Sequence, residues 1–130
     1  MRKHIFTLVF LLTPFICDAQ DSLFVFLYET NSRDVLNAMD NADFRPATSI
    51  ELRLFKENNL SNLIPMMKSE SMHSTDIKWF NVVALGAARN GFATELKCNP
   101  SEKNSFSVTD ITLDPNHTWP AGTIFLGKRL

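Results

Sequence analysis

The fold is decided by residues 77–98, which read IKWFNVVALGAARNGFATELKC. The first part, Ile77–Ala88, is a long apolar run typical of a buried strand. Asn90 and Gly91 follow, and both residue types tolerate the positive φ angles of a type I′ turn. Beyond the turn, apolar and polar residues alternate as far as Cys98, as in a second strand. The stretch therefore predicts an antiparallel hairpin.

Two further strands are predicted after this hairpin. Phe106–Leu113 is a strand candidate between two polar turns, and Thr123–Leu126 follows the turn at residues 120–122. Each of these turns contains Pro, Gly or Asn, the residues that most often interrupt regular structure. The second half of the chain therefore predicts an antiparallel β-meander of four strands.

The first half begins with a strand and a helix. Leu23–Tyr28 reads LFVFLY, a continuous apolar run with the length and aromatic content of a strand buried on both faces. Asn31 then fits a helix N-cap with Asp34 in the first turn, and Pro46 closes the helical segment.

The next segment, Ser49–Phe55, admits two interpretations. Its residues SIELRLF alternate strictly between polar and apolar, which predicts a half-exposed strand. The alternative is a helix, because Thr48 and Glu51 have the spacing of a capping box. We prefer the strand, and we expect a short second helix to begin near Ser61. The order is then β-α-β-α followed by an antiparallel β-meander, an α+β fold with the helices packed on one face of the sheet.

The segment Leu23–Phe55 resembles the small βαβ modules of outer-membrane secretins and TonB-dependent receptors. The similarity lies in the apolar strand, the helical stretch RDVLNA at residues 33–38, and the expected second strand. It covers about a quarter of the chain. Where those modules carry a glycine-containing connection after the helix, this chain has DFRP at residues 43–46. No functional residue is therefore carried over.

The N-terminus has the pattern of a secretory signal. Arg2 and Lys3 precede an almost uninterrupted apolar stretch, and Ala19 is a small residue at the expected cleavage position. We therefore expect residues 1–19 to be a cleaved signal peptide and residues 20–130 to form a single α+β domain, secreted or periplasmic, without a transmembrane segment. The minority interpretation is a lipid anchor on Cys17.

Charge and cysteine content narrow the class of partner. Removing the signal changes the formal net charge from −1 to −2, which does not suggest nucleic acid or an anionic membrane as a partner. Another protein is the partner that we expect. Cys98 would then be the single cysteine of the mature chain, so no intramolecular disulfide is expected. A buried thiol is the preferred interpretation, with intermolecular pairing or a reactive thiol as alternatives.

Catalytic and metal-binding motifs are missing from the sequence. His73 and His117 stand alone in polar loops without metal-ligand spacing, so no metal and no cofactor are expected. One enzymatic alternative is a small secreted hydrolase that uses Asp110, Asp114 and His117 as acid and base, because these residues lie in one strand–turn segment.

The loop DPNHTWPAG, residues 114–122, gathers the candidate binding residues Asp114, Asn116, His117 and Trp119. A Trp ring held beside Pro120 is typical of a contact for a partner protein or a platform for a sugar. The interpretation that we prefer for Trp119 itself is that the ring folds back to cap one end of the core. Asn116 also begins a glycosylation sequon, as does Asn59.

These observations favour an exported, non-catalytic interaction protein. Its role would be that of a periplasmic accessory subunit, an inhibitor or immunity-type protein, or a secreted effector. The alternatives are the hydrolase and a carbohydrate-binding module that uses Trp119.

Overall fold

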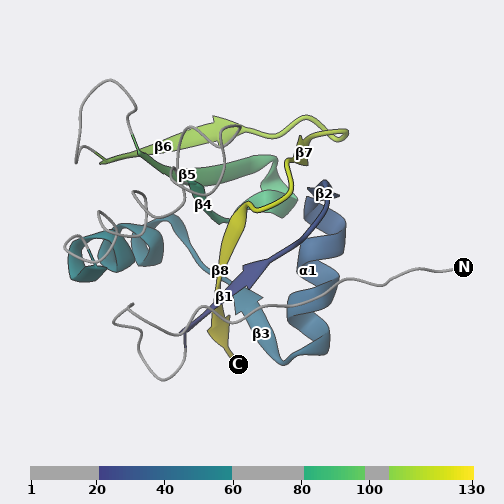
Figure 1. Cartoon of the computed structure of the whole chain (residues 1–130), viewed down its shortest axis with the longest axis horizontal. Coiled ribbons are helices and arrows are strands. Elements are labelled where there is room, and N and C mark those ends of the chain that lie inside the picture. Colours follow the sequence, from purple (N-terminus) through teal and green to yellow (C-terminus); the bar gives the residue numbers. More distant parts are fainter. Residues whose placement is uncertain (1–20, 60–80, 99–105) are drawn as a thin grey trace, which may run out of the picture.

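The structure, a computed structural model, describes residues 21–59, 81–98 and 106–130 (Figure 1). Its main sheet contains β1 (Asp21–Val25), β3 (Phe44–Pro46), β4 (Asn81–Ala84), β5 (Phe92–Cys98), β6 (Phe106–Thr112) and β8 (Ile124–Arg129). A separate two-stranded sheet pairs β2 (Thr30–Asn31) with β7 (Thr118–Trp119). The helices are α1 (Ser32–Asn41), a second helix over residues 49–59, and the 3-10 turn η1 (Ala88–Asn90). The predicted α+β class is confirmed.

Some predictions lie outside the described residues. These are the signal peptide and the lipid anchor at Cys17, the helix expected near Ser61, and the loop around His73. The backbone of Cys98 ends β5, but the burial of its thiol also lies outside the described side chains.

The strand order of the main sheet is β1-β8-β4-β5-β6, with β3 also paired to β8. The antiparallel meander is confirmed for β4, β5 and β6. The expected fourth meander strand is placed differently, because β8 lies between β1 and β4 and runs parallel to β4. Along the edge of β8 that faces away from β1, Ile124 and Phe125 pair with β4, and residues 127–129 pair with β3. A strand of six residues, four of them buried, is suited to this central position.

The predicted strand over Ser49–Phe55 is wrong, and the segment is helical through residue 59. The capping box decides the outcome. The backbone N–H of Thr48 donates to the Glu51 carboxylate at 2.9 Å, and the backbone N–H of Glu51 donates to the Thr48 hydroxyl at 3.1 Å. These two bonds satisfy backbone donors that a helix start would otherwise leave unpaired. The second strand of the βαβ resemblance is therefore absent from this segment.

The expectation that the helices pack on one face of the sheet is also wrong. Leu52 and Phe55 of the second helix share one apolar core with Leu23 and Val25 of β1. Val35, Ala38 and Met39 of α1 belong to a different core that includes Phe24. Alternate residues of β1 thus enter opposite cores, and Figure 1 shows the helices on opposite sides of β1 and β8. The reason is the central sheet itself, since a strand that is apolar on both faces needs cover on both.

The hairpin predicted at Asn90-Gly91 is confirmed, but its turn is longer than expected. Residues 85–91 connect β4 to β5 and include η1. Gly91 has a φ of 86° and terminates η1. Only the glycine therefore uses the left-handed conformation that both residues allow.

Helix α1 begins at the predicted cap. The Asn31 side-chain oxygen accepts a hydrogen bond of 2.9 Å from the backbone N–H of Asp34. At the other end the backbone reverses at Asp43, which has a φ of 64°. A non-glycine residue in this conformation costs free energy, so the exit from α1 is locally strained.

Gly127 of β8 allows a close aromatic packing beside α1. A Cβ added there would lie 2.9 Å from the Phe24 ring. Phe24 packs edge-to-face against Phe44 at 5.4 Å between ring centroids, and the Arg129 guanidinium lies 4.6 Å from the Phe44 centroid. The missing side chain at residue 127 therefore makes room for the ring of the neighbouring strand.

Candidate functional site

Trp119, one of the four residues suggested for binding, is not presented to solvent. It lies in β7 with 2 % of its surface exposed, and its ring packs against Phe125 at 5.4 Å between centroids. The preferred interpretation, that Trp119 folds back onto the core, is therefore the one observed, and the alternative of an exposed ring is wrong. The physical reason is that the indole ring has a large apolar area, and removing this area from water stabilises the folded protein.

The other three predicted binding residues lie on the turn before β7. The Asp114 carboxylate accepts a 2.9 Å hydrogen bond from the backbone N–H of Asn116, so this acid shapes the turn. Asn116 is exposed. His117 is half-buried, with its ring centroid 4.5 Å from that of Trp119 in an edge-on contact. A binding role for Asp114, Asn116 and His117 stays a prediction.

The residues of the hydrolase alternative have separate partners. Asp110 accepts a 2.7 Å hydrogen bond from the Thr94 hydroxyl on the neighbouring strand. Asp114 holds its turn, and His117 packs on Trp119. Within the described ranges, no group of three His, Cys, Asp or Glu side chains is arranged to hold a metal ion. Because acid and base catalysis needs groups that converge on one substrate, this geometry does not favour hydrolysis.

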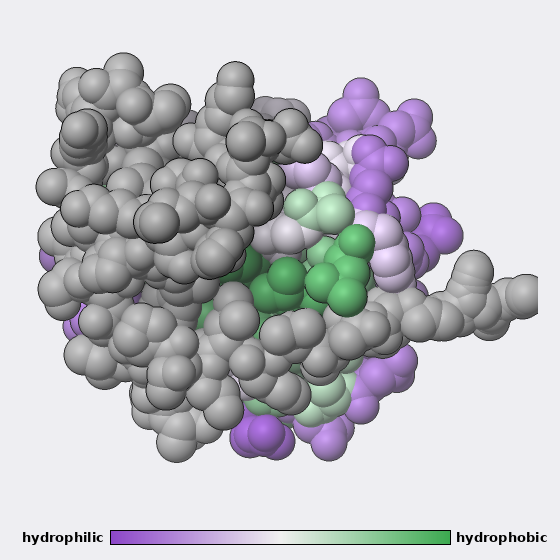
Figure 2. All heavy atoms as spheres, in the orientation of Figure 1, coloured by the Kyte–Doolittle hydropathy of each residue, from purple (hydrophilic) through white to green (hydrophobic). Residues whose placement is uncertain are grey.

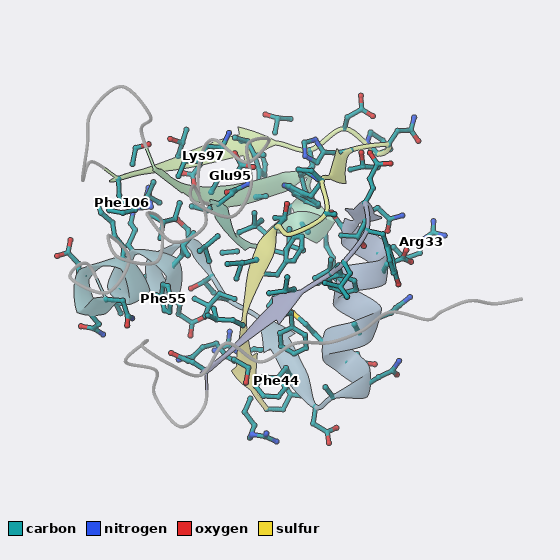
Figure 3. All side chains as sticks on the ribbon, in the orientation of Figure 1. Arg33, Phe44, Phe55, Glu95, Lys97 and Phe106 are labelled. Atoms are coloured by element: carbon teal, nitrogen blue, oxygen red, sulfur yellow. The ribbon has the colours of Figure 1, made fainter. Side chains whose placement is uncertain are left out.

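A polar cluster around Glu95 is the feature of the core that the sequence analysis missed. The Glu95 carboxylate is buried on β5 and accepts a 3.4 Å hydrogen bond from the Trp119 indole N–H. Lys97 Nζ lies 3.2 Å from its other oxygen, and the Asn81 amide donates a longer bond of 3.5 Å. Figure 3 shows Glu95 and Lys97 side by side on β5. The cluster satisfies the one polar atom of the buried indole and balances the buried charge, so its role is structural.

The second helix is attached to the sheet by an ion pair at its first turn. Nη1 and Nη2 of Arg45 donate 2.8 Å hydrogen bonds to Glu51, one to each carboxylate oxygen. These bonds are the main reason that the pKa of Glu51 falls to about 2. The start of the helix is therefore held both by the capping box and by β3.

The outward face of this helix is the strongest candidate for a functional surface. Leu52 and Phe55 point into the core, whereas Ile50 and Leu54, one turn apart, are 71 % and 57 % exposed. Arg53 lies on the same exposed face and donates to the Ser49 hydroxyl at 3.1 Å. No ion pair of Arg53 occurs among the described residues. We call Ile50, Arg53 and Leu54 the outer helix face.

A second exposed apolar group follows β1. Leu27 and Tyr28 are 60 % and 45 % exposed, and Tyr28 packs edge-on against Phe26. In the space-filling view, apolar residues gather near the centre of the visible face, with hydrophilic residues on the side of α1 (Figure 2). These two residues lie outside regular secondary structure. The outer helix face differs because a helix holds its side chains in fixed register.

The two glycosylation sequons differ in accessibility. Asn59 is fully buried and donates to the Phe55 carbonyl oxygen at 3.0 Å, so it lies on the inner side of the helix. Asn116 is exposed.

In the described part of the chain, no helix has the length and apolar character needed to cross a bilayer. No protein family, curated protein or solved structure matches this chain.

Proposed function

We propose that the protein is an exported, non-catalytic interaction protein that binds a partner protein through the outer helix face. The observation that carries the proposal is the exposure of Ile50 and Leu54, one turn apart and beside Arg53, on a helix whose opposite side is already buried. Large aliphatic side chains left in water at one place are typical of a contact surface. Arginine is among the residues that contribute most to binding energy in such surfaces.

The composition of the outer helix face defines the chemistry of the partner. Ile50 and Leu54 require an apolar surface, and Arg53 requires a carboxylate beside it. A planar guanidinium binds a carboxylate through two parallel hydrogen bonds, which orients the partner as well as attracting it. We therefore propose a partner protein with an apolar patch bordered by Asp or Glu.

Export is part of the proposal and rests on the signal pattern of residues 1–19. An accessory subunit of an envelope assembly, an inhibitor or immunity-type protein, and a secreted effector all agree with a small protein that acts by contact. The three roles differ in where the partner resides. Fractionation into envelope and medium separates an envelope role from a secreted one, and the intact mass of the recovered protein distinguishes cleavage after Ala19 from lipidation at Cys17.

The decisive experiment compares capture by three forms of the full chain. The tagged wild type, the double variant Ile50→Ser/Leu54→Ser and the control Asp40→Ser are each incubated with envelope and medium fractions. Asp40 is exposed on α1, on the other side of β1 and β8, so its replacement matches a helical surface position without touching the outer helix face. We expect a stoichiometric partner with the wild type and the control, and a loss of about tenfold or more in affinity with the double variant.

A third variant, Arg53→Glu, tests the charge of the partner. Its binding is expected to fall most at low salt, where charges act over longer distances. A partner that binds the double variant as tightly as the wild type would refute the assignment of this face. Retained folding of each variant is checked by circular dichroism.

A further inference from the structure

β6 is the last strand of the main sheet. Its only neighbour among the described strands is β5, to which it is paired along its whole length from Phe106 to Thr112. In Figure 1 it forms the outer border of the sheet beyond β5. A strand in this position presents a row of backbone donors and acceptors along its free side.

The register identifies which residues carry these outward groups. The backbone N–H of Leu113 donates to the Gly91 carbonyl oxygen at 2.8 Å, so Leu113 and Gly91 form a hydrogen-bonded pair in the continuation of the β5–β6 ladder. Hydrogen-bonded and non-hydrogen-bonded pairs alternate along an antiparallel ladder. Ser107, Thr109 and Ile111 therefore bond to β5. The backbone groups of Phe106, Val108, Asp110 and Thr112 point away from it.

β6 has few of the sequence features that protect free edges. The strand reads FSVTDIT, with no Lys, Arg, Pro or Gly, and Asp110 is its one charged residue. Natural edge strands are commonly protected by lysine, proline or a bulge. β-branched residues make up most of the rest, and these favour an extended backbone. The edge is thus suited to pairing with another strand.

We propose that two copies of this chain pair through β6, in antiparallel orientation about a twofold axis at Thr109. In this register Val108 lies opposite the partner's Asp110, and Phe106 lies opposite the partner's Thr112. All four residues with outward backbone groups are then paired, which gives roughly eight hydrogen bonds between the chains. A twofold contact of one patch with itself is the commonest form of protein assembly.

The number of paired residues and the charge of Asp110 favour this register over its neighbours. Shifting the pairing by one step in either direction leaves one of the four outward residues unpaired. In one direction the shift also places Asp110 opposite the partner's Asp110, and like charges directly opposite each other are unfavourable. The strand is therefore complementary to itself in one register, which is why a second copy, and not an unrelated peptide, is the occupant that we propose. This surface is separate from the outer helix face and does not depend on its function.

Cysteine cross-linking tests both the contact and the register. Thr109 would lie opposite the partner's Thr109 in a non-hydrogen-bonded pair with Cα atoms about 4.5 Å apart, within the range of a disulfide. In the full chain carrying Cys17→Ser and Cys98→Ser, we expect Thr109→Cys to form a disulfide-linked dimer under mild oxidation. Ser107→Cys is the control, because its Cα would lie roughly 13 Å from that of the partner's residue 107.

The mass of the unmodified full chain provides the second measurement. Light scattering after size exclusion is expected to show a dimer for the wild type and a monomer for Thr109→Lys, which places two positive charges together at the axis. A wild type that is monomeric across the accessible concentrations would overturn the proposal. Equal cross-linking of Thr109→Cys and Ser107→Cys, or none of either, would overturn the register.

Discussion

The ion pair between Arg45 and Glu51 makes a contribution to stability that depends on pH. Lowering the pKa of Glu51 from 4.5 to about 2 corresponds to roughly 3 kcal/mol at most. The Arg45 side chain is 43 % exposed, and screening by solvent reduces this contribution to about 1–2 kcal/mol. We expect Glu51→Gln to lower the free energy of unfolding by that amount at pH 7. Gln keeps an acceptor for the Thr48 N–H, so the substitution removes the charge and one of the two hydrogen bonds from Arg45 but leaves the capping bond in place.

The sign of the pH dependence follows from the lowered pKa. The stabilisation is complete above pH 4.5, where Glu51 is ionised in both states, and it is lost as the pH falls towards 2. Urea unfolding at pH 7 and pH 3 measures it, and the difference between wild type and Glu51→Gln is expected to shrink to about two fifths at pH 3. Glu57→Gln, an exposed position on the same helix, is the control and is expected to change stability by less than about 0.5 kcal/mol. A difference of equal size at both pH values would refute the reasoning.

Three further predictions concern packing and backbone conformation. Leu52→Ala is expected to lower the free energy of unfolding in urea by about 2–5 kcal/mol, because the side chain is fully buried, and Leu54→Ala by less than about 0.5 kcal/mol. Equal losses for the two variants would contradict the orientation of the helix. Gly127→Ala is expected to lower the free energy of unfolding by about 2 kcal/mol, because the added Cβ meets an aromatic ring. Gly91→Ala has open space around the added Cβ and is expected to cost only about 1 kcal/mol, because of its positive φ. The reverse order of the two losses in the same assay would refute the packing argument. Asp43→Gly is expected to raise the midpoint of thermal unfolding by a few degrees, because glycine relieves the strain at φ 64°; a lower midpoint would show that the Asp side chain contributes more than the strain costs.

Local signals in the sequence predicted the elements that depend on neighbouring residues. The start of α1 was readable because an Asn side chain satisfies a backbone donor three residues later, and Asn31 does so. The β4–β5 hairpin was readable because Gly91 allows a positive φ. Both features are decided by a few adjacent residues, and so they do not require knowledge of the rest of the chain.

The position of β8 was not predictable in this way. Its pairing with β1 joins residues about a hundred positions apart, such as Val25 and Ile124. An apolar strand at the end of the chain fits a meander next to β6 equally well by its own composition. What favours the central position is that β8 there contacts β1, β3 and β4 together, and a single strand's sequence contains no sign of that combination.

The outer helix face could not be predicted once residues 49–55 were interpreted with the two-residue period of a strand. Taken as a strand, SIELRLF places Ile50, Leu52 and Leu54 on one face, and all three are then assigned to the core. Taken as a helix, the same residues separate, because a period of 3.6 turns Leu52 inward with Phe55 and leaves the other two outside with Arg53. A single local feature favours the helix over the strand, namely the capping box at Thr48 and Glu51, which is present in the sequence and decides the structure.

Trp119 shows the opposite effect of context on a conspicuous residue. Beside Pro120 in a polar loop it had the composition of a contact residue, yet its indole N–H finds a buried acceptor in Glu95, so burial leaves no polar atom unsatisfied. Ile50 and Leu54 do not pack into the core in this way, because the inner side of their helix is already occupied by Leu52 and Phe55. Ile50 and Leu54 lie outside both cores of the described residues and are exposed, so their apolar surface is available to another molecule, and this is why the outer helix face, and not the tryptophan loop, carries the proposed function.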